Sequence, residues 1–272
     1  MMPTTGMMRG TGSMASANFE FRIENLSHVR RVGRTSDVAV GPVSLELKGG
    51  EFLSVIGPAA CGKTALVKMI AGILQISEGK VCISGAEIYP PCRDFGLVLK
   101  RPALLPWRTS MRNILLQAEM CGTDPGESRD RARRLLAWFG LSKFEHSLPH
   151  ELPRGGAEAV AICRALVHNP AVLVMDEPFG SLDPLALELI LDAFQRLRME
   201  AGTTTLLCTG NMQEAVLLGD RVAVMSPQPG RILHTFSIDL PRPRRLDKSM
   251  TPQIAEYCNR IRTSYRALGI LP

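Results

Sequence analysis

The stretch "FLSVIGPAACGKT", Phe52–Thr64, decides the fold class of this chain. A short apolar run ends at Gly57 and Pro58, as a buried strand does, and the residues from Lys63 to Ile73 have a helical pattern. Between them, "GPAACGKT" fits G-x-x-x-x-G-K-[ST], in which glycines allow close backbone approach and successive N–H groups point at a phosphate. The stretch therefore predicts a strand, a phosphate-binding loop and a helix in direct succession.

This loop predicts a nucleotide site with a magnesium ion. Lys63 is expected to reach the β- and γ-phosphate oxygens, and Thr64 to offer its hydroxyl to Mg²⁺. If Ala60 adopts a positive φ, the strain costs about 1 kcal/mol, which a fold tolerates. The predicted nucleotide-binding residues are Gly57, Pro58, Ala59, Ala60, Cys61, Gly62, Lys63, Thr64 and Ala65.

A second motif, "AVLVMDEP" (Ala171–Pro178), places two carboxylates at the end of a strongly apolar run. Ligands of open α/β sheets lie at the carboxyl ends of the strands. We expect Asp176 to hold Mg²⁺ through water and Glu177 to polarise the water that attacks the γ-phosphate, with Lys63 as the other catalytic group. An acidic turn without function is the alternative, and the phosphate loop disfavours it.

Strand and helix patterns alternate along the rest of the chain, which predicts an α/β fold with a mostly parallel sheet. Asp183-Pro184 predicts the start of a helix, with aspartate at the N-cap and proline in the first turn. A helix-rich middle, Ser110 to Asn169, reads as an insertion, and a terminal helix follows a Pro/Arg loop. The expected strands are Phe19–Leu26, Val38–Leu47, Phe52–Ile56, Phe95–Leu99, Ala171–Met175, Thr203–Cys208, Arg221–Met225 and Arg231–Ile238.

The amino-acid composition restricts the class of protein further. Apolar residues make up 45% of the 272, which argues against disorder, and no apolar run approaches the roughly 18–20 residues that span a bilayer. The seven cysteines form no C-x-x-C pair, as expected in a reducing compartment. We expect a flexible leader at 1–18, a nucleotide-binding domain at 19–238 with a helical subdomain at about 102–168, and a C-terminal extension at 239–272.

Taken together, these motifs resemble the nucleotide-binding subunits of ABC transporters, in order and spacing from about Phe19 to Ile232. "DEPFGSLDP" adds the family's aspartate loop, with Asp183 as the matching residue at the dimer contact. "RPALLPWRTSMRNI" and "EAVLLGDRVAVMSPQPGRI" are similar to bacterial importers for nitrate, sulfonate and taurine. The resemblance implies a P-loop NTPase core: a mostly parallel sheet with helices on both faces, an N-terminal antiparallel β portion and an inserted helical subdomain.

The resemblance also implies ATP and Mg²⁺ as cofactors and several partners. These are a second ATP-binding subunit, membrane permease subunits and, indirectly, a substrate-binding protein, with the chain peripheral to the cytoplasmic face of the inner membrane. Each ATP site of the family joins one chain's phosphate loop to the other chain's glycine-rich signature. A groove near Ala103–Asn113 is expected to receive a permease helix, with the docking residues Ala103, Leu104, Leu105, Pro106 and Trp107.

Three family motifs are altered in this sequence. Lys100 stands where the family has a glutamine that contacts Mg²⁺ and the attacking water, and Gly210 replaces the switch histidine. Ungapped alignment of "LPRGGAEAVAICRAL" puts Pro153 at the signature serine and Arg154 at its first glycine; a one-residue shift restores the glycines but breaks the spacing that follows. "LSHVRRVG" lacks the usual adenine-stacking aromatic, so Arg30 or Arg31 is expected to stack instead.

Three functions follow from these observations. The first is an importer ATP-binding subunit that couples ATP binding and weak hydrolysis to the transport of a small anion. The second is a degenerate regulatory subunit that pairs with a competent ATPase, so that hydrolysis by this chain stays an open question. The third, a nucleic-acid-associated ABC protein, has only the net charge of +6 in its favour, and the sequence lacks the aromatic–basic interleaving of a single-strand platform.

Overall fold

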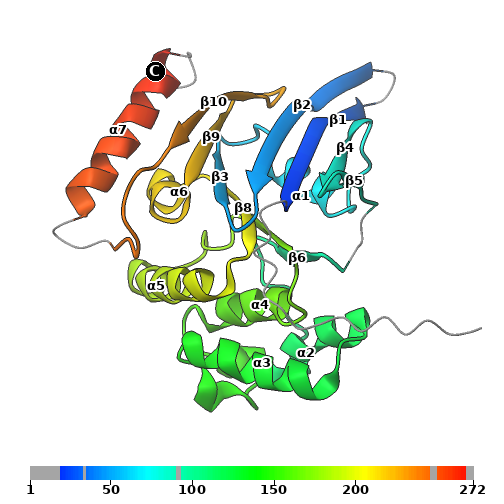
Figure 1. Cartoon of the computed structure of the whole chain (residues 1–272), viewed down its shortest axis with the longest axis vertical. Coiled ribbons are helices and arrows are strands. Elements are labelled where there is room, and N and C mark those ends of the chain that lie inside the picture. The colour runs from blue at the N-terminus through cyan, green and yellow to red at the C-terminus, as the bar shows by residue number, and fades with distance from the viewer. Residues whose placement is uncertain (1–18, 33–34, 90–92, 246–249, 268–272) are drawn as a thin grey trace, which may run out of the picture.

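A computed structural model describes residues 19–32, 35–89, 93–245 and 250–267. Its strands form two sheets, with orders β2-β1-β4-β5 and β10-β9-β3-β8-β7-β6 (Figure 1). The larger sheet contains β3 (Phe52–Ile56), β6 (Phe95–Val98), β7 (Val172–Asp176), β8 (Thr204–Thr209), β9 (Arg221–Met225) and β10 (Ile232–Ser237). The predicted α/β class with a mostly parallel sheet is confirmed, because every pair in this sheet is parallel except β9–β10.

The central strands are buried on both faces, which explains why their sequences are nearly continuous apolar runs. All residues of β3, β7 and β8 are buried. Along β3 the side chains alternate between two cores: Phe52 and Ile56 belong to one, and Leu53 and Val55 to the other. The first core includes helices α4, α5 and α6, and the second is closed by α1 and the smaller sheet.

The smaller sheet is antiparallel and consists of β1 (Glu20–Val32), β2 (Thr35–Lys48), β4 (Glu78–Ile83) and β5 (Ala86–Glu87). The first two were predicted, but β1 runs further than Leu26. The sequence did not predict β4 or β5. Only Val81 and Cys82 of β4 are buried, and both residues of β5 are exposed, so neither segment shows an alternating apolar pattern.

Helices α2 (Ser110–Cys121), α3 (Pro125–Trp138) and α4 (Gly156–Leu166) form the helical part beyond the edge strand β6 (Figure 1). Two of them begin at side-chain caps: Thr109 accepts a hydrogen bond from the Arg112 N–H, and Asp124 accepts one from the Glu127 N–H. The 3₁₀ segments Ser142–Phe144 and Pro149–Glu151 connect α3 to α4.

Helix α1 (Lys63–Ile70) is shorter than the predicted Lys63–Ile73. Gly72 has a φ of +69° just beyond the helix, and Ile73 is 57% exposed, so the apolar pattern continued past the helix end. β2 begins three residues before the predicted Val38, and the ends of the predicted strands in the larger sheet agree within one residue. Helix α5 (Pro184–Ala201) begins at the predicted cap Asp183, whose carboxylate accepts from the N–H groups of Leu185 and Ala186.

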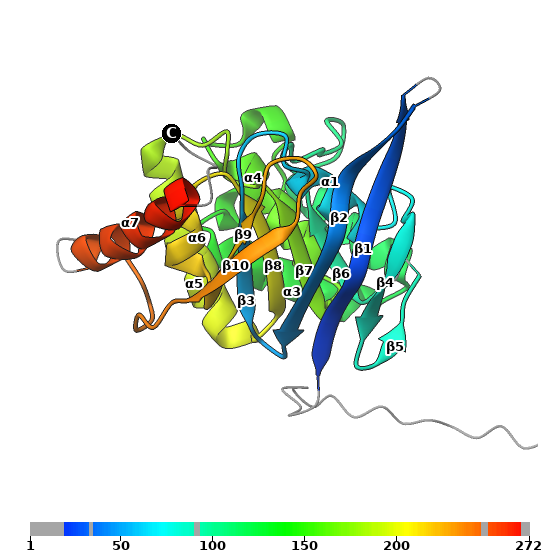
Figure 2. The same ribbon diagram turned by 90° about the horizontal axis from the view of Figure 1, so that it is seen from above.

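The C-terminal helix α7 (Thr251–Ala267) packs beside α6 (Met212–Leu218) and β10 (Figure 2). Its buried residues, Ile254, Cys258, Ile261 and Tyr265, follow helical spacing. The preceding Pro/Arg loop is fixed by Arg244, a buried guanidinium that donates to the carbonyls of Val216, Gly219, Ile238 and Leu240. Of the helices within the described ranges, none is long and apolar enough to cross a membrane.

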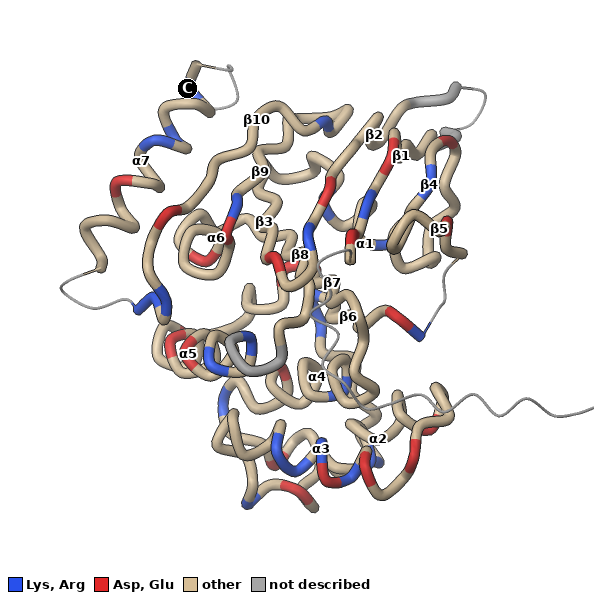
Figure 3. Tube along the Cα trace, in the orientation of Figure 1, with Lys and Arg blue, Asp and Glu red and all other residues tan. Residues whose placement is uncertain are grey.

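Arginines of the two basic sequence clusters make contacts within the chain. Arg133 lies 3.5 Å from the Glu145 carboxylate, Arg131 donates to the Leu166 carbonyl, and Arg242 pairs with Asp220 at 2.8 Å. Basic and acidic residues both occur along the described part of the trace, including α3 (Figure 3). The structure thus gives the basic clusters a role in packing the chain.

Candidate nucleotide-binding site

The phosphate loop connects the buried strand β3 to α1 at the carboxyl edge of the larger sheet, where β6, β7 and β8 also end. Two of its residues have left-handed backbones: Gly62, with φ +106°, and Ala60, with φ +61°. The positive φ whose cost was considered for Ala60 is therefore present. A Cβ at Gly62 would lie 2.4 Å from a methyl group of Val40, so that position requires glycine both for conformation and for space.

Lys63 lies at the centre of this loop, with a side chain only 7% exposed. Its ammonium donates to the carbonyls of Gly57, at 2.9 Å, and Pro58, at 3.1 Å, and lies 3.7 Å from the Cys61 sulfur. The same nitrogen is 4.0 Å from Oε1 of Glu177. The loop thus holds a buried cation at the N-terminus of α1, where the helix dipole also favours an anion.

Thr64 and Asp176, the two residues that the sequence assigns to Mg²⁺, meet beside the loop. The Thr64 hydroxyl donates to Oδ1 of Asp176 at 3.1 Å. Burial raises the pKa of Asp176, and the Thr64 hydrogen bond only partly opposes this. A hydroxyl and a carboxylate are the oxygen ligands that Mg²⁺ prefers, and a bound cation would favour the ionised carboxylate, so the two residues fit such an ion.

Glu177 extends from the end of β7 toward two ammonium groups. Its backbone has φ +43°, and its N–H donates to the Cys208 carbonyl at 2.7 Å. Lys100, which follows β6, donates to Oε2 of Glu177 at 2.6 Å, while Lys63 faces Oε1. The hydrogen bond to Glu177 raises the pKa of the Lys100 ammonium. The carboxylate that the sequence predicts to polarise the attacking water is therefore engaged by a lysine.

Gly210, at the end of β8, faces the same carboxylate. A Cβ built there would lie 3.9 Å from Oε1 of Glu177. The flanking polar residues turn away toward a buried acid: the Thr209 hydroxyl donates to Oε2 of Glu214 at 2.7 Å, and the Asn211 amide donates to Oε1 at 3.1 Å. Position 210 thus borders the site but presents no hydrogen-bonding side chain to it.

The burial of Glu214 leads us to predict that the free energy of unfolding depends on pH. Burial raises its pKa, and the hydrogen bonds from Thr209 and Asn211 only partly oppose the increase. Protonated Glu214 therefore contributes stability below the unfolded pKa of about 4.3, and this contribution is lost as the pH rises through the folded value. The glutamine of Glu214→Gln stays neutral at every pH. We therefore expect the free energy of unfolding of this variant, relative to that of the wild type, to increase between about pH 4 and pH 7 in urea titrations. A difference that does not change with pH would contradict this.

The glycine-rich loop before α4 lies next to the start of α5. Gly155 caps α4 with φ +75°, and a Cβ there would lie 2.9 Å from Cδ1 of Ile190. Arg154 is 87% exposed, and its Nη1 lies 3.3 Å from Oδ2 of Asp183. The hydrogen bond from the Ala186 N–H holds the pKa of Asp183 below its usual range, and Arg154 lowers it further, while burial partly opposes both. Arg154 therefore pairs with the aspartate loop of its own chain.

The loop Ala103–Trp107, which is predicted to dock a partner, is fixed by hydrogen bonds to its backbone and exposed at Pro106 and Trp107. Arg164 of α4 donates to the carbonyls of Pro102, at 2.7 Å, and Ala103, at 2.9 Å. Ala103 has φ +46°, Leu104 and Leu105 are half-buried, Pro106 is exposed and Trp107 is 72% exposed. An exposed indole on a fixed loop is unusual for a surface that contacts only water.

Asn113 fixes the same loop from α2. Its buried amide accepts from the Leu105 N–H and donates to the carbonyls of Leu105, Arg108 and Thr109. Asn113→Ala leaves these groups without their partner and is expected to lower the free energy of unfolding by about 2 kcal/mol. Chemical denaturation measures this, with Asn259→Ala on the exposed face of α7 as a control expected to change stability by less than about 0.5 kcal/mol. Equal effects of the two substitutions would contradict the role of Asn113.

Sequence reasoning missed the positioning roles of Asn113, Arg164 and Glu214. A signal existed for two of them, because Arg164 interrupts the apolar run "AVAICRALV" and Asn113 stands at a buried position of α2. The predicted adenine contacts, Arg30 and Arg31, lie outside the residues whose side chains the structure describes.

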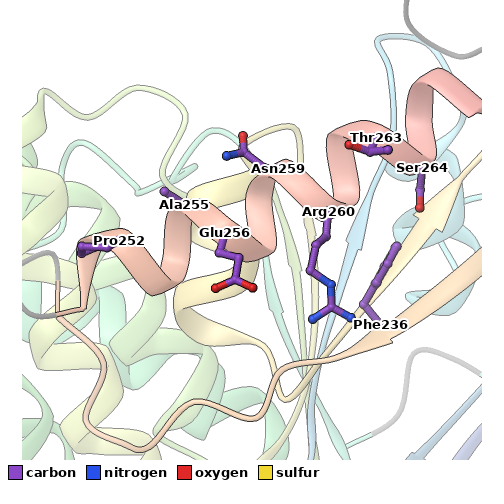
Figure 4. A pocket seen from close by; sticks show the side chains of 8 residues that line it. All are labelled: Phe236, Pro252, Ala255, Glu256, Asn259, Arg260, Thr263 and Ser264. Carbon is purple, nitrogen blue, oxygen red and sulfur yellow. The ribbon is translucent and has the colours of Figure 1, made fainter.

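A separate hollow of about 570 Å³ lies between α7 and β10 (Figure 4). In the close-up, Arg260 extends from α7 toward Phe236 on the strand. The phosphate loop contributes nothing to this hollow, which is lined by Phe236, Pro252, Ala255, Glu256, Asn259, Arg260, Thr263 and Ser264.

Comparison with known proteins agrees with this geometry. The profile of the family described as "ABC transporter" matches residues 40–180. The taurine import ATP-binding protein TauB of Roseobacter denitrificans is 37% identical over 220 residues, which cover 81% of this chain and 79% of that protein. The aliphatic sulfonates import ATP-binding protein SsuB 1 of Xanthomonas axonopodis pv. citri is 38% identical over 204 residues, which cover 74% and 81%.

Solved structures give the same result. The dimeric structure of MJ0796, a bacterial ABC transporter cassette, superposes with a TM-score of 0.71 at 26% identity over 81% of this chain and all of that one. A second structure of MJ0796, in a post-hydrolysis state with bound ADP and Pi, gives a TM-score of 0.70. The phosphate loop, the acidic strand end and these similarities agree: the chain belongs to the ABC transporter family, as one of its ATP-binding subunits.

Proposed function

We propose that this chain is the ATP-binding subunit of an importer for a small anion of the nitrate, sulfonate or taurine type. The observation that carries the proposal is the phosphate loop Gly57–Thr64 at the carboxyl edge of the sheet, with the Thr64 hydroxyl on Asp176. Relatives named as taurine and aliphatic sulfonates import proteins support the class of cargo.

In this proposal the loop N–H groups, the N-terminus of α1 and Lys63 bind the phosphates of ATP. Asp176, through water, and Thr64 would hold Mg²⁺, which would neutralise charge on the β- and γ-phosphates. Lys63 is already desolvated within the loop, so its charge acts on the phosphates with little screening from water. The residues proposed for nucleotide contact are those from Gly57 through Ala65.

Two further surfaces would join the chain to its partners at the cytoplasmic face of the membrane. The loop Ala103–Trp107 presents an exposed indole on a backbone fixed by Arg164 and Asn113, which suits the docking of an apolar permease segment. A second ATP-binding subunit would contact the surface around Arg154 and Asp183, which this chain already links by an ion pair. A substrate-binding protein would act indirectly, through the permease.

Three observations favour weak or partner-dependent hydrolysis, and with it a second candidate: a regulatory nucleotide-binding subunit that pairs with a competent ATPase. Lys100 stands where the family has a glutamine that contacts the attacking water, Gly210 presents no side chain to Glu177, and Pro153 has neither a hydroxyl nor an N–H for a partner's phosphate. Loss of one transition-state contact typically lowers a rate about 10²–10³-fold, and such losses need not add.

ATP and ADP binding by the purified chain, alone and with its transporter subunits, tests the proposal. Saturable binding of both nucleotides is expected for the chain alone, and faster phosphate release is expected only in the complex. The absence of binding to either nucleotide, by a chain that shows a cooperative unfolding transition, would reject both candidates. Phosphate release by the lone chain at rates typical of enzymes would reject the second candidate only.

A further inference from the structure

One carboxylate is shared by two lysines at the end of β7. Oε2 of Glu177 accepts from Lys100 at 2.6 Å, and Oε1 lies 4.0 Å from the ammonium of Lys63. Lys63 belongs to the phosphate loop, so the Glu177 carboxylate lies between the ammonium of Lys100 and the ammonium of the loop lysine. Lys100 therefore lies at the edge of the space where the terminal phosphate of a bound nucleotide is expected.

The two lysines differ in how firmly they are held. Lys63 is 7% exposed and tied to the carbonyls of Gly57 and Pro58, whereas the Lys100 side chain is 63% exposed. The pair of Lys100 with Glu177 is the only contact of that ammonium among the interactions described, and a pair with one well-exposed partner is weak. Of the three groups, Lys100 is the one that can exchange its partner at little cost.

A triphosphate supplies a stronger partner. Its terminal phosphate carries more negative charge than a carboxylate and offers more acceptor oxygens, so it competes with Glu177 for an ammonium within reach. When Lys100 leaves, Oε2 of Glu177 is free to accept from another donor, such as a water molecule. The exchange therefore couples the presence of a terminal phosphate to the release of the carboxylate.

We propose, on the basis of the ATP-binding function above, that Lys100 is a sensor of the terminal phosphate: it pairs with Glu177 without nucleotide and with the γ-phosphate when ATP is bound. Because Lys100 supplies a positive charge close to where Thr64 and Asp176 would hold Mg²⁺, it also makes ATP binding less dependent on that ion. ADP, which lacks the γ-phosphate, leaves Lys100 on Glu177.

Equilibrium binding of ATP and ADP to the full chain, measured with EDTA and again with Mg²⁺, tests this proposal. Lys100→Gln is expected to weaken ATP binding in EDTA about tenfold, the size of one charge-assisted contact, and to change ADP binding less than about twofold. Mg²⁺ is expected to restore most of the lost ATP affinity. Lys100→Arg is expected to preserve the wild-type preference for ATP over ADP.

Arg101→Gln is the matched control, because it removes one positive charge from the adjacent exposed residue. It is expected to leave both affinities unchanged in EDTA. An equal loss of ATP and ADP affinity in Lys100→Gln, an equal loss in Arg101→Gln, or a gain of ATP affinity in EDTA would overturn the sensor. A wild-type chain that binds neither nucleotide would instead overturn the proposed function, so the two failures are distinguishable.

Discussion

Lys63→Ala is expected to weaken ATP binding by this chain about 100-fold, the largest loss that we predict for a single substitution. The Lys63 ammonium is buried in the phosphate loop and is held by two loop carbonyls, so its charge acts at short range and with little solvent screening. Loss of one or two desolvated, charge-assisted contacts is worth about 3 kcal/mol, which corresponds to about two orders of magnitude in the dissociation constant. Isothermal titration with ATP and Mg²⁺ measures the change.

The control for this experiment is Lys143→Ala, which removes a lysine from an exposed position in a 3₁₀ segment. Its ATP affinity is expected to equal that of the wild type. Because Lys63 is buried, thermal unfolding of Lys63→Ala must show a cooperative transition before the affinity is compared. A folded Lys63→Ala that binds ATP as the wild type does would contradict the placement of the phosphates at this loop.

The double substitution Pro153→Ser with Arg154→Gly is expected to raise ATP turnover of the assembled transporter about tenfold or more. Serine would restore a hydroxyl and an N–H at a position that now has neither, and glycine would remove a large side chain from the loop before α4. A single transition-state contact typically contributes about 10²–10³ in rate, and we expect a smaller gain because Lys100 and Gly210 remain. Steady-state phosphate release by the reconstituted complex measures it.

Arg154→Ala alone separates two effects, because it breaks the ion pair with Asp183 without restoring the serine. Its turnover is expected to stay close to that of the wild type, since an exposed ion pair contributes little. If Arg154→Ala accelerates turnover as much as the double substitution does, the serine has no part in the gain. If neither changes the rate, the limit on hydrolysis does not lie in this loop.

The sequence was sufficient to predict those features of the structure whose conformation depends on neighbouring residues in the chain. The strand β3 and the cap at Asp183 each follow from residue types in a short window. Thr64 and Asp176 were both assigned to Mg²⁺, and they meet although they are far apart in the chain, because parallel strands β3 and β7 bring their carboxyl ends to one edge of the sheet.

What the sequence did not predict depends on side chains that meet through the tertiary fold. The sequence identifies Lys100 as a replacement for the family's glutamine, yet its position beside Glu177 emerges only when β6 and β7 lie next to each other. Strands β4 and β5 were missed because most of their residues are exposed and because they form only by pairing, β4 with β1 and β5 with β4. Glu214 lies in the first turn of α6, and the local sequence there indicates only the start of a helix, not that this acid is buried.

We propose that this chain binds ATP at Gly57–Thr64 while its altered residues restrain hydrolysis. The most direct test measures ATP binding and phosphate release on one preparation of the purified wild-type chain with Mg²⁺, beside Glu177→Gln. We predict saturable ATP binding by both chains, with wild-type turnover at least tenfold below about 1 s⁻¹, the low end of common enzyme rates. Turnover by the lone wild-type chain well above that value, abolished by Glu177→Gln, would contradict the claim.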